Sequence, residues 1–139
     1  MGNPEVKRWD NGQVIIPAGK YSSLREAVEK EYNNLSRANL SWADLSGANL
    51  FRANLSGADL FRAKMWGEVI NKQPIQISGL GWWITIAEKH IQIGCEVHKA
   101  EEWFKFKDSR IKLMHKDALK WWKKHKKFIK SAWELHEED

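Results

Sequence analysis

The chain has 139 residues, enough for one domain or for one core with an attached lobe, and 42% of its residues are hydrophobic while 29% are charged. This balance is typical of a soluble globular protein, and no apolar run is long enough for a membrane span. The net charge of +5 permits an anionic partner without requiring one, and the polar start argues against a signal peptide.

Two residue types bear on environment and packing. Cys95 is the single cysteine, which excludes an internal disulfide and favours a reducing, cytoplasmic setting. The chain also has nine tryptophans, an unusual number for its length. Tryptophan fills cores and interfaces, so these rings predict either a thick aromatic core or a stacking or interface surface.

The N-terminal part, residues 1–32, predicts a strand followed by a capped helix. The apolar run Val14–Ile16 is the strand, and Ser23 and Glu26 have the spacing of a capping box that opens about two turns of helix. The open end of a repeat stack exposes apolar side chains and unpaired backbone groups. We therefore expect this strand and helix to cap the segment that follows, residues 33–67.

A period of five residues organises that segment. Leu or Met recurs at every fifth position, an Ala stands two residues before six of these, and Asn or Asp stands between them in most units. The apolar series is Leu35, Leu40, Leu45, Leu50, Leu55, Leu60 and Met65. On a helix, steps of about 140° would form no stripe, and on a flat strand an odd spacing would alternate faces. Small units that cannot bury themselves alone predict a stack of coils.

The units Ala-Asn-Leu-Ser-Trp, Ala-Asp-Leu-Ser-Gly and Ala-Asn-Leu-Phe-Arg resemble the pentapeptide-repeat family. That resemblance implies a right-handed quadrilateral β-helix with Leu and Ala inside and about twenty residues in each coil. The expected fold class is mixed α/β. The short β-helix is capped by the N-terminal strand and helix and is followed by a β-hairpin and C-terminal helices in residues 68–139.

The outward positions of the repeats carry aromatic and mainly positive side chains. The longer, acidic members of the family imitate DNA, and this short, mixed-charge stack does not suit that role. Trp42 and Arg62 are twenty residues apart, so they are expected to stack as a cation–π pair. Phe51, Phe61 and Trp66 are also predicted to point outward. We expect these five residues to form an interface, with the rest of the chain or with a second copy in a homo-oligomer.

Alternating apolar and polar residues after Gly67 predict a strand at residues 75–78 and a hairpin at residues 82–93. A two-residue turn at Glu88 and Lys89 would pair Ile84 with Ile93, Ile86 with Ile91 and Thr85 with Gln92. One face is then apolar, and the other is polar. The polar face comprises Gln76, Ser78, Trp83, Thr85, His90 and Gln92. It is either solvent-facing or the floor of a small-ligand site.

A metal or nucleophilic site near Cys95 is not supported by the spacing. His90, Cys95 and His98 lack a fourth ligand at a recognised zinc spacing. Alternation places Cys95 on the apolar side of the hairpin, so a buried structural thiol is expected. We expect no metal, no cofactor and no catalytic residue.

The C-terminal sequence predicts two or three helices, of which the last is long. The first covers residues 99–107, the second runs from Asp108 or Ser109 to Met114, and the last from about Asp117 to His136. The apolar line of the last helix comprises Ala118, Trp121, His125, Phe128, Ala132 and Leu135, and Leu119, Trp122, Ile129 and Trp133 widen this line to a broad face. Its other face carries Lys120, Lys123, Lys124, Lys127 and Lys130. These lysines are solvated, or contact a phosphate-bearing ligand or nucleic acid. Burial of the apolar face against a sheet is favoured over a membrane surface.

The order of these elements resembles small pentapeptide-repeat accessory proteins of bacteriophages. That resemblance implies a genomic setting and the host bacterial cytoplasm, without an activity. No phosphate-binding loop and no nucleophile with a base is evident, so the protein is expected not to be an enzyme.

Three functions remain open. The first is counter-defence by binding and sequestering a small anionic, nucleotide-like signal. The predicted binding residues are Trp83, Thr85, Lys89, His90, Gln92, Lys123 and Lys127. The second is a protein-interaction module that inhibits a host factor, and the third is nucleic-acid binding through the lysine-rich helix.

Overall fold

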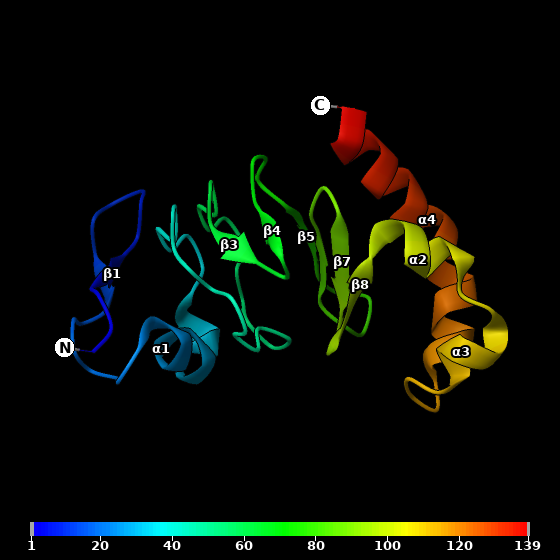
Figure 1. Cartoon of the computed structure of the whole chain (residues 1–139), viewed down its shortest axis with the longest axis horizontal. Coiled ribbons are helices and arrows are strands. Elements are labelled where there is room, and N and C mark those ends of the chain that lie inside the picture. The colour runs from blue at the N-terminus through cyan, green and yellow to red at the C-terminus, as the bar shows by residue number, and fades with distance from the viewer. Residues whose placement is uncertain (1, 139) are drawn as a thin grey trace.

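The computed structural model describes residues 2–138, whose elements follow one another along the longest axis of the molecule (Figure 1). The N-terminal hairpin and first helix lie at one end, next to the repeat segment, which we define as residues 34–67. A four-stranded sheet follows, and three helices form the opposite end. The sheet therefore lies between the repeats and the C-terminal helices.

The N-terminal elements are β1 (Val6–Lys7), β2 (Val14–Ile16), α1 (Leu24–Lys30) and the short 3-10 helix η1 (Tyr32–Asn34). β1 and β2 pair antiparallel, so the predicted strand is confirmed with a partner strand that the sequence analysis did not identify.

The predicted capping box at the start of α1 is half formed. The Ser23 side chain accepts a hydrogen bond from the Glu26 N–H at 3.1 Å, as expected. The Glu26 carboxylate accepts from the N–H of Ser22 at 3.2 Å, one residue before the position that a capping box uses. Ala27 and Val28 are buried in the core of the repeats, so α1 covers one end of the repeat segment.

Most repeat units form the same two local hydrogen bonds. The Ala N–H donates to the Leu carbonyl three residues earlier, as Ala38 does to Leu35 at 3.0 Å. The Asn or Asp side chain accepts from the N–H two residues later, as Asn39 does from Ser41 at 3.2 Å. The same turn recurs at Asp44, Asn49, Asn54 and Asp59. The recurring Asn or Asp is thus explained by turn formation.

Residues twenty positions apart lie on neighbouring layers. Asn39 pairs in parallel with Asp59, and Asp44 pairs with Lys64. The predicted inward series, from Leu35 to Met65, is buried at every position. Four five-residue units therefore make one coil. Among the alanines, Ala43 and Ala48 are only half-buried.

The strands from β3 onward, the first of which ends the repeat segment, form two antiparallel sheets. β3 (Lys64–Met65) and β4 (Glu68–Val69) make a small hairpin, and the larger sheet has the order β5 (Ile75–Ile77), β6 (Ile84–Ile86), β7 (His90–Ile93) and β8 (Glu96–Lys99). The predicted register is confirmed, with Ile84 opposite Ile93, Thr85 opposite Gln92 and Ile86 opposite Ile91. β8 was not predicted as a strand.

The C-terminal helices are α2 (Ala100–Lys105), α3 (Asp108–Lys112) and α4 (Ala118–Glu138). Their number and order match the prediction. The residue before α3 is Lys107, so neither Asp108 nor Ser109 caps that helix. No helix within residues 2–138 is both long and apolar enough to cross a membrane.

Two hydrophobic cores lie on the two sides of the large sheet. The first joins the N-terminal elements, the repeats and Ala87. The second joins the sheet residues Ile84, Ile86, Ile91 and Ile93 to α2, α3 and α4. The centre of the polar face is covered rather than solvent-facing, contrary to one reading of the sequence, whereas Ser78 after β5 is exposed. Thr85 and Gln92 are buried on that face.

The buried face of α4 is turned by one residue from the predicted apolar line. Trp122, Ile129 and His136 are buried, whereas Phe128 and Leu135 are 53% and 63% exposed. Two contacts position the helix: Trp122 packs against Trp103, with ring centroids 5.2 Å apart, and His136 Nε2 lies 2.8 Å from the Gln73 carbonyl. Periodicity alone could not choose between adjacent apolar positions.

The prediction of a buried Cys95 thiol was wrong. Cys95 is exposed because β7 ends at Ile93, and Gly94 and Cys95 form the turn that leads into β8. Alternation along a strand does not continue through a turn.

Candidate ligand-binding site

The residues predicted to bind the ligand do not form one site. Thr85 and Gln92 are buried, and the Thr85 hydroxyl accepts from Gln76 Nε2 at 3.2 Å. Lys123 and Lys127 lie on α4, which packs on the opposite face of the sheet. Lys89 is exposed in the two-residue turn before β7, and Trp83 is half-buried beside β6. The sheet itself separates the lysines of α4 from the polar face.

His90 has a structural contact in place of the predicted ligand contact. Its Nδ1 lies 2.6 Å from Glu68 Oε2, and the Glu68 side chain is only 2% exposed. The ring of Trp66 lies near the same imidazole, with centroids 6.5 Å apart. This contact joins β4 to β7, and Trp66, which the sequence analysis had placed outward, is half-buried beside it.

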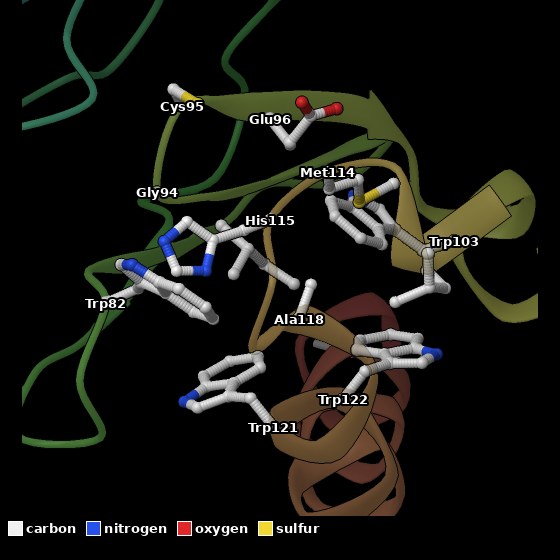
Figure 2. Close-up of a pocket in the computed structure, with 12 residues that line it drawn as sticks. Trp82, Gly94, Cys95, Glu96, Trp103, Met114, His115, Ala118, Trp121 and Trp122 are labelled. Atoms are coloured by element: carbon white, nitrogen blue, oxygen red, sulfur yellow. The ribbon is translucent and has the colours of Figure 1, made fainter. Parts of the chain in front are cut away.

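A hollow lined by tryptophans opens on the other face of the sheet (Figure 2). It has a volume of about 80 Å³ and lies between the β7–β8 turn, α2 and the start of α4. Its aromatic lining comprises Trp82, Trp103, His115, Trp121 and Trp122. We call this hollow the tryptophan pocket.

Edge-to-face packing holds one side of the tryptophan pocket. The Trp82 ring lies 5.2 Å from the rings of both His115 and Trp121, at interplanar angles of 78° and 61°. These angles are typical of stable aromatic pairs. Gly94 beside Trp82 has a φ of +56°, a backbone conformation that favours glycine in the turn before β8.

Indole hydrogen bonds hold two of the lining rings. Trp103 Nε1 donates to the Ile91 carbonyl at 2.8 Å, and Trp121 Nε1 donates to the Leu80 carbonyl. Both indole N–H groups are thus engaged by backbone carbonyls, which hold the two rings in place beside the pocket. The pocket is therefore preorganised for a flat, apolar group.

Few polar groups border the tryptophan pocket. His115 Nδ1 accepts from the Asp117 N–H at 3.1 Å, which orients the imidazole at the start of α4. Glu96 Oε1 lies 2.8 Å from His98 Nε2. The Cys95 thiol lies at the rim, where Figure 2 shows it directed away from the aromatic rings.

Sequence reasoning missed this pocket because its lining comes from distant parts of the chain. The repeated Trp-Trp pairs, Trp82–Trp83 and Trp121–Trp122, were the available signal. Trp82 lines the pocket and Trp83 does not, whereas both Trp121 and Trp122 line it. Which ring points inward depended on the register of the sheet and the rotation of α4.

The five predicted interface residues are partly exposed. Trp42 is 69% and Phe61 45% exposed, and their rings pack edge to face with centroids 6.2 Å apart. The predicted cation–π pair is confirmed, with Arg62 Cζ 5.3 Å from the Trp42 ring centroid. Phe51 and Trp66 are half-buried.

Candidate metal ligands do not cluster in the part of the chain that is described. No group of three or more His, Cys, Asp or Glu side chains among residues 2–138 is placed to hold a metal ion. His90, Cys95 and His98 in particular do not come together, because His90 contacts Glu68 and His98 contacts Glu96.

The comparisons with known proteins identify the repeats and nothing beyond them. Searches of the curated proteins and of the solved structures gave no significant match. The family model described as pentapeptide repeats matches residues 34–67 in eight copies, one more than the seven units counted from Leu and Met. This match favours a non-enzymatic structural or interaction role. The repeat segment of this chain is thus a run of pentapeptide repeats.

Proposed function

We propose that this protein binds and sequesters a small anionic, nucleotide-like ligand, with the ring of the ligand held in the tryptophan pocket. The observation that carries the proposal is the pocket itself, in which anchored aromatic rings surround an apolar hollow open to solvent. Stacking of a base on an aromatic ring is worth about 1–3 kcal/mol. The proposed site thus lies on the opposite face of the sheet from the one that the sequence favoured.

Lysines at the start of α4 suit the anionic part of such a ligand. Trp121 and Trp122 line the pocket, and the exposed Lys120 and Lys124 lie on the same helix within one turn of Trp121. A phosphate needs positive or hydrogen-bonding partners, which these side chains can supply. Lys123 is less suited, because it forms an ion pair with Asp108 at 3.3 Å.

Calorimetric titration against a panel of linear and cyclic nucleotides tests the proposal. We expect His115→Ala to weaken binding about tenfold, the equivalent of one lost stacking contact. Its side chain is 49% exposed, so the core should remain intact. Trp82→Ala should weaken binding as well. Trp83→Ala is the matched control and should leave affinity unchanged. Failure of the parent protein to bind any member of the panel would overturn the proposal.

The wider setting is also part of this proposal. A non-enzymatic protein that removes a nucleotide signal would serve a bacteriophage as an accessory counter-defence protein in the host bacterial cytoplasm. This setting rests on the resemblance drawn from the sequence, in which repeats are followed by a tryptophan-rich hairpin and basic helices. We further propose that the repeats form a right-handed quadrilateral β-helix, supported by the twenty-residue spacing of paired residues.

An interaction module is the second candidate, favoured by the exposed Trp42 and Phe61 rings. A large, exposed aromatic pair on a repeat surface is typical of a contact site. In this candidate the surface formed by Trp42, Phe61 and Arg62 contacts a host protein or a second copy. Sedimentation at micromolar concentration tests self-association, and a single species of 16.2 kDa would exclude the second copy as the contact.

A further inference from the structure

A groove at the junction of the repeats and β5 has a different character from the tryptophan pocket. It has a volume of about 480 Å³ and lies between the N-terminal hairpin, the repeat layer 55–60 and the segment that enters β5. The lining of this groove includes Trp9, Gly57, Ala58 and Gln76. We call it the layer-edge groove.

The first coil shows which backbone groups point from one layer to the next. The Arg37 N–H donates to the Ser56 carbonyl at 2.9 Å, and the Ala38 carbonyl accepts from the Asp59 N–H at 2.8 Å. Gly57 and Ala58 are the residues twenty positions later. By equivalence, the Gly57 N–H and the Ala58 carbonyl point toward the position of a next layer.

No next layer is formed at this position. Among residues 2–138, no hydrogen bond reaches either the Gly57 N–H or the Ala58 carbonyl. The neighbouring groups are covered: the Leu60 N–H donates to Gln73 Oε1 at 3.1 Å, and the Arg62 N–H donates to the Ile70 carbonyl at 2.6 Å. At the layer-edge groove, the unpaired backbone groups are therefore the Gly57 N–H and the Ala58 carbonyl.

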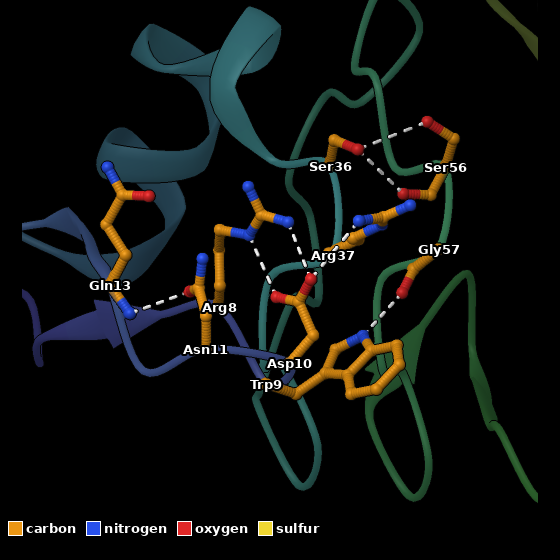
Figure 3. A network of polar contacts seen from close by, with 9 residues as sticks. All are labelled: Arg8, Trp9, Asp10, Asn11, Gln13, Ser36, Arg37, Ser56 and Gly57. Atoms are coloured by element: carbon orange, nitrogen blue, oxygen red, sulfur yellow. Dashed lines mark hydrogen bonds and ion pairs between the residues drawn. The ribbon is translucent and has the colours of Figure 1, made fainter.

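The side chains beside this edge are positioned for a ligand. Trp9 Nε1 donates to the Gly57 carbonyl at 2.6 Å, which holds the indole beside the layer, as Figure 3 shows, while the residue remains 55% exposed. Gln76 donates through Nε2 to Thr85, and within the described chain its buried Oε1 has no hydrogen-bond partner. A buried acceptor without a partner is costly unless something supplies a donor.

We propose that the layer-edge groove binds a short extended segment of a partner polypeptide, which takes the place of the missing layer. One carbonyl of the segment accepts from the Gly57 N–H, one N–H donates to the Ala58 carbonyl, and a further N–H donates to Gln76 Oε1. Main-chain pairing at an open sheet edge is an established mode of peptide recognition. A proline or aromatic side chain of the segment packs on the exposed face of Trp9.

The electrostatics of the groove restrict the sequence of the segment. Asp59 lines the groove, and its Oδ1 already accepts from Gln73 Nε2 at 2.7 Å and from the Phe61 N–H at 3.0 Å. Its remaining charge disfavours an acidic side chain nearby. The segment is therefore neutral or basic beside Asp59, which distinguishes this groove from the anion site proposed above.

Nuclear magnetic resonance titration of the full ¹⁵N-labelled chain tests this inference. The probes are acetylated pentapeptide amides with Ala, Pro, Phe, Asn, Arg or Asp at the centre. We expect saturable shifts of the Gly57 amide and the Trp9 indole N–H with at least one neutral or basic probe. The same probe methylated on its backbone nitrogens should bind about tenfold more weakly, because it loses main-chain donors.

Variants separate this groove from other sites. Gln76→Leu removes the free acceptor and should weaken the best probe about fivefold, whereas Gln13→Leu, a matched change at an exposed position of the N-terminal hairpin, should have no effect. Absence of shifts with every probe would overturn the inference, as would equal binding of the methylated probe. If the chemical shift of the Gly57 amide instead changes with the concentration of the protein itself, the groove binds a second copy. That result would also overturn the inference.

Discussion

The repeat segment and the C-terminal lobe, residues 68–138, bury apolar side chains in opposite ways. In the repeats each coil places Leu and Ala at equivalent positions, so every layer packs on a near copy of itself. In the lobe, Trp82, Trp103 and Trp122 come from three different elements and pack at unrelated angles. Regular layers leave little space inside, whereas large rings of unlike orientation leave a hollow among them.

The two candidate sites follow from this difference. The tryptophan pocket lies inside the irregular lobe, where rings do not fill the space between helices and sheet. The layer-edge groove lies where the regular stack stops, because a repeat that ends leaves backbone groups unpaired. Regular packing thus produces a site only at its edge, and irregular packing produces one inside.

The largest expected effect tests the regular core. Leu50 is 5% exposed, so Leu50→Asp should bury a carboxylate without a partner and lower the free energy of unfolding by about 4 kcal/mol or more. Asn49→Asp is the control, because the outward side chain keeps the Oδ1 acceptor for the Phe51 N–H. Chemical denaturation of both variants measures the difference. Equal stabilities would contradict the assignment of inward and outward positions.

The second prediction tests the irregular core. Trp122 is 4% exposed and packs against Trp103 and Phe104, so Trp122→Ala should cost about 3–5 kcal/mol. Phe128→Ala on the same helix should cost less than about 1 kcal/mol, since Phe128 is 53% exposed. Thermal unfolding of the two variants would reveal the orientation of α4. A larger loss of stability for Phe128→Ala than for Trp122→Ala would show that α4 is buried along the apolar line predicted from the sequence.

A smaller effect is expected on the repeat surface. The Arg62 guanidinium lies over the exposed Trp42 ring, and such a pair is worth about 0.5–1 kcal/mol. A double-mutant cycle with Arg62→Ala and Trp42→Ala measures this coupling in the free energy of unfolding. Additive effects of the two substitutions would show that the stacked pair contributes nothing to stability.

The smallest effect is expected from acid. A hydrogen bond from Arg8 lowers the pKa of Asp10 to about 2, and a hydrogen bond from Tyr21 lowers the pKa of Glu31 to about 2. Because both values lie below the ordinary 3.8 and 4.5, the folded state favours the charged carboxylates, so their contribution is complete above about pH 4.5 and is lost as pH falls toward 2.

The unfolding midpoint should therefore decline over that range. The Asp10 and Glu31 side chains are 23% and 12% exposed, and solvent reaches their cationic partners Arg8 and Lys20, so the decline should be shallow. Asp10→Asn with Glu31→Gln should flatten it, and Lys7→Gln, elsewhere in the same hairpin, should not. An unchanged slope in the double variant would assign the acid sensitivity to other groups.

Much of the fold was predictable because its signals are local. The five-residue period determined which repeat side chains are buried, and alternation around Glu88 and Lys89 determined the register of β6 and β7. Ser23 marked the start of α1 in the same way. Each of these features depends on neighbouring residues, whose spacing the sequence states directly.

The positions of the sites could not be predicted in this way. Nothing local to Thr85 or Gln92 states that the repeats cover their face of the sheet, and nothing local to Phe128 states that α4 docks through Trp122 instead. Cys95 is exposed because a turn ends the alternation before it.

By itself, the sequence determined the repeat, its inward residues and the pairing of the central hairpin. The reason is that, for a given backbone geometry, the spacing of two residues determines whether their side chains lie on the same side. Only the tertiary structure decided which face of the sheet meets the repeats and which meets α4. That choice follows from packing between elements far apart in the chain, where ring shape, hydrogen bonds such as Trp103 to Ile91, and contacts such as Glu68 to His90 select one arrangement.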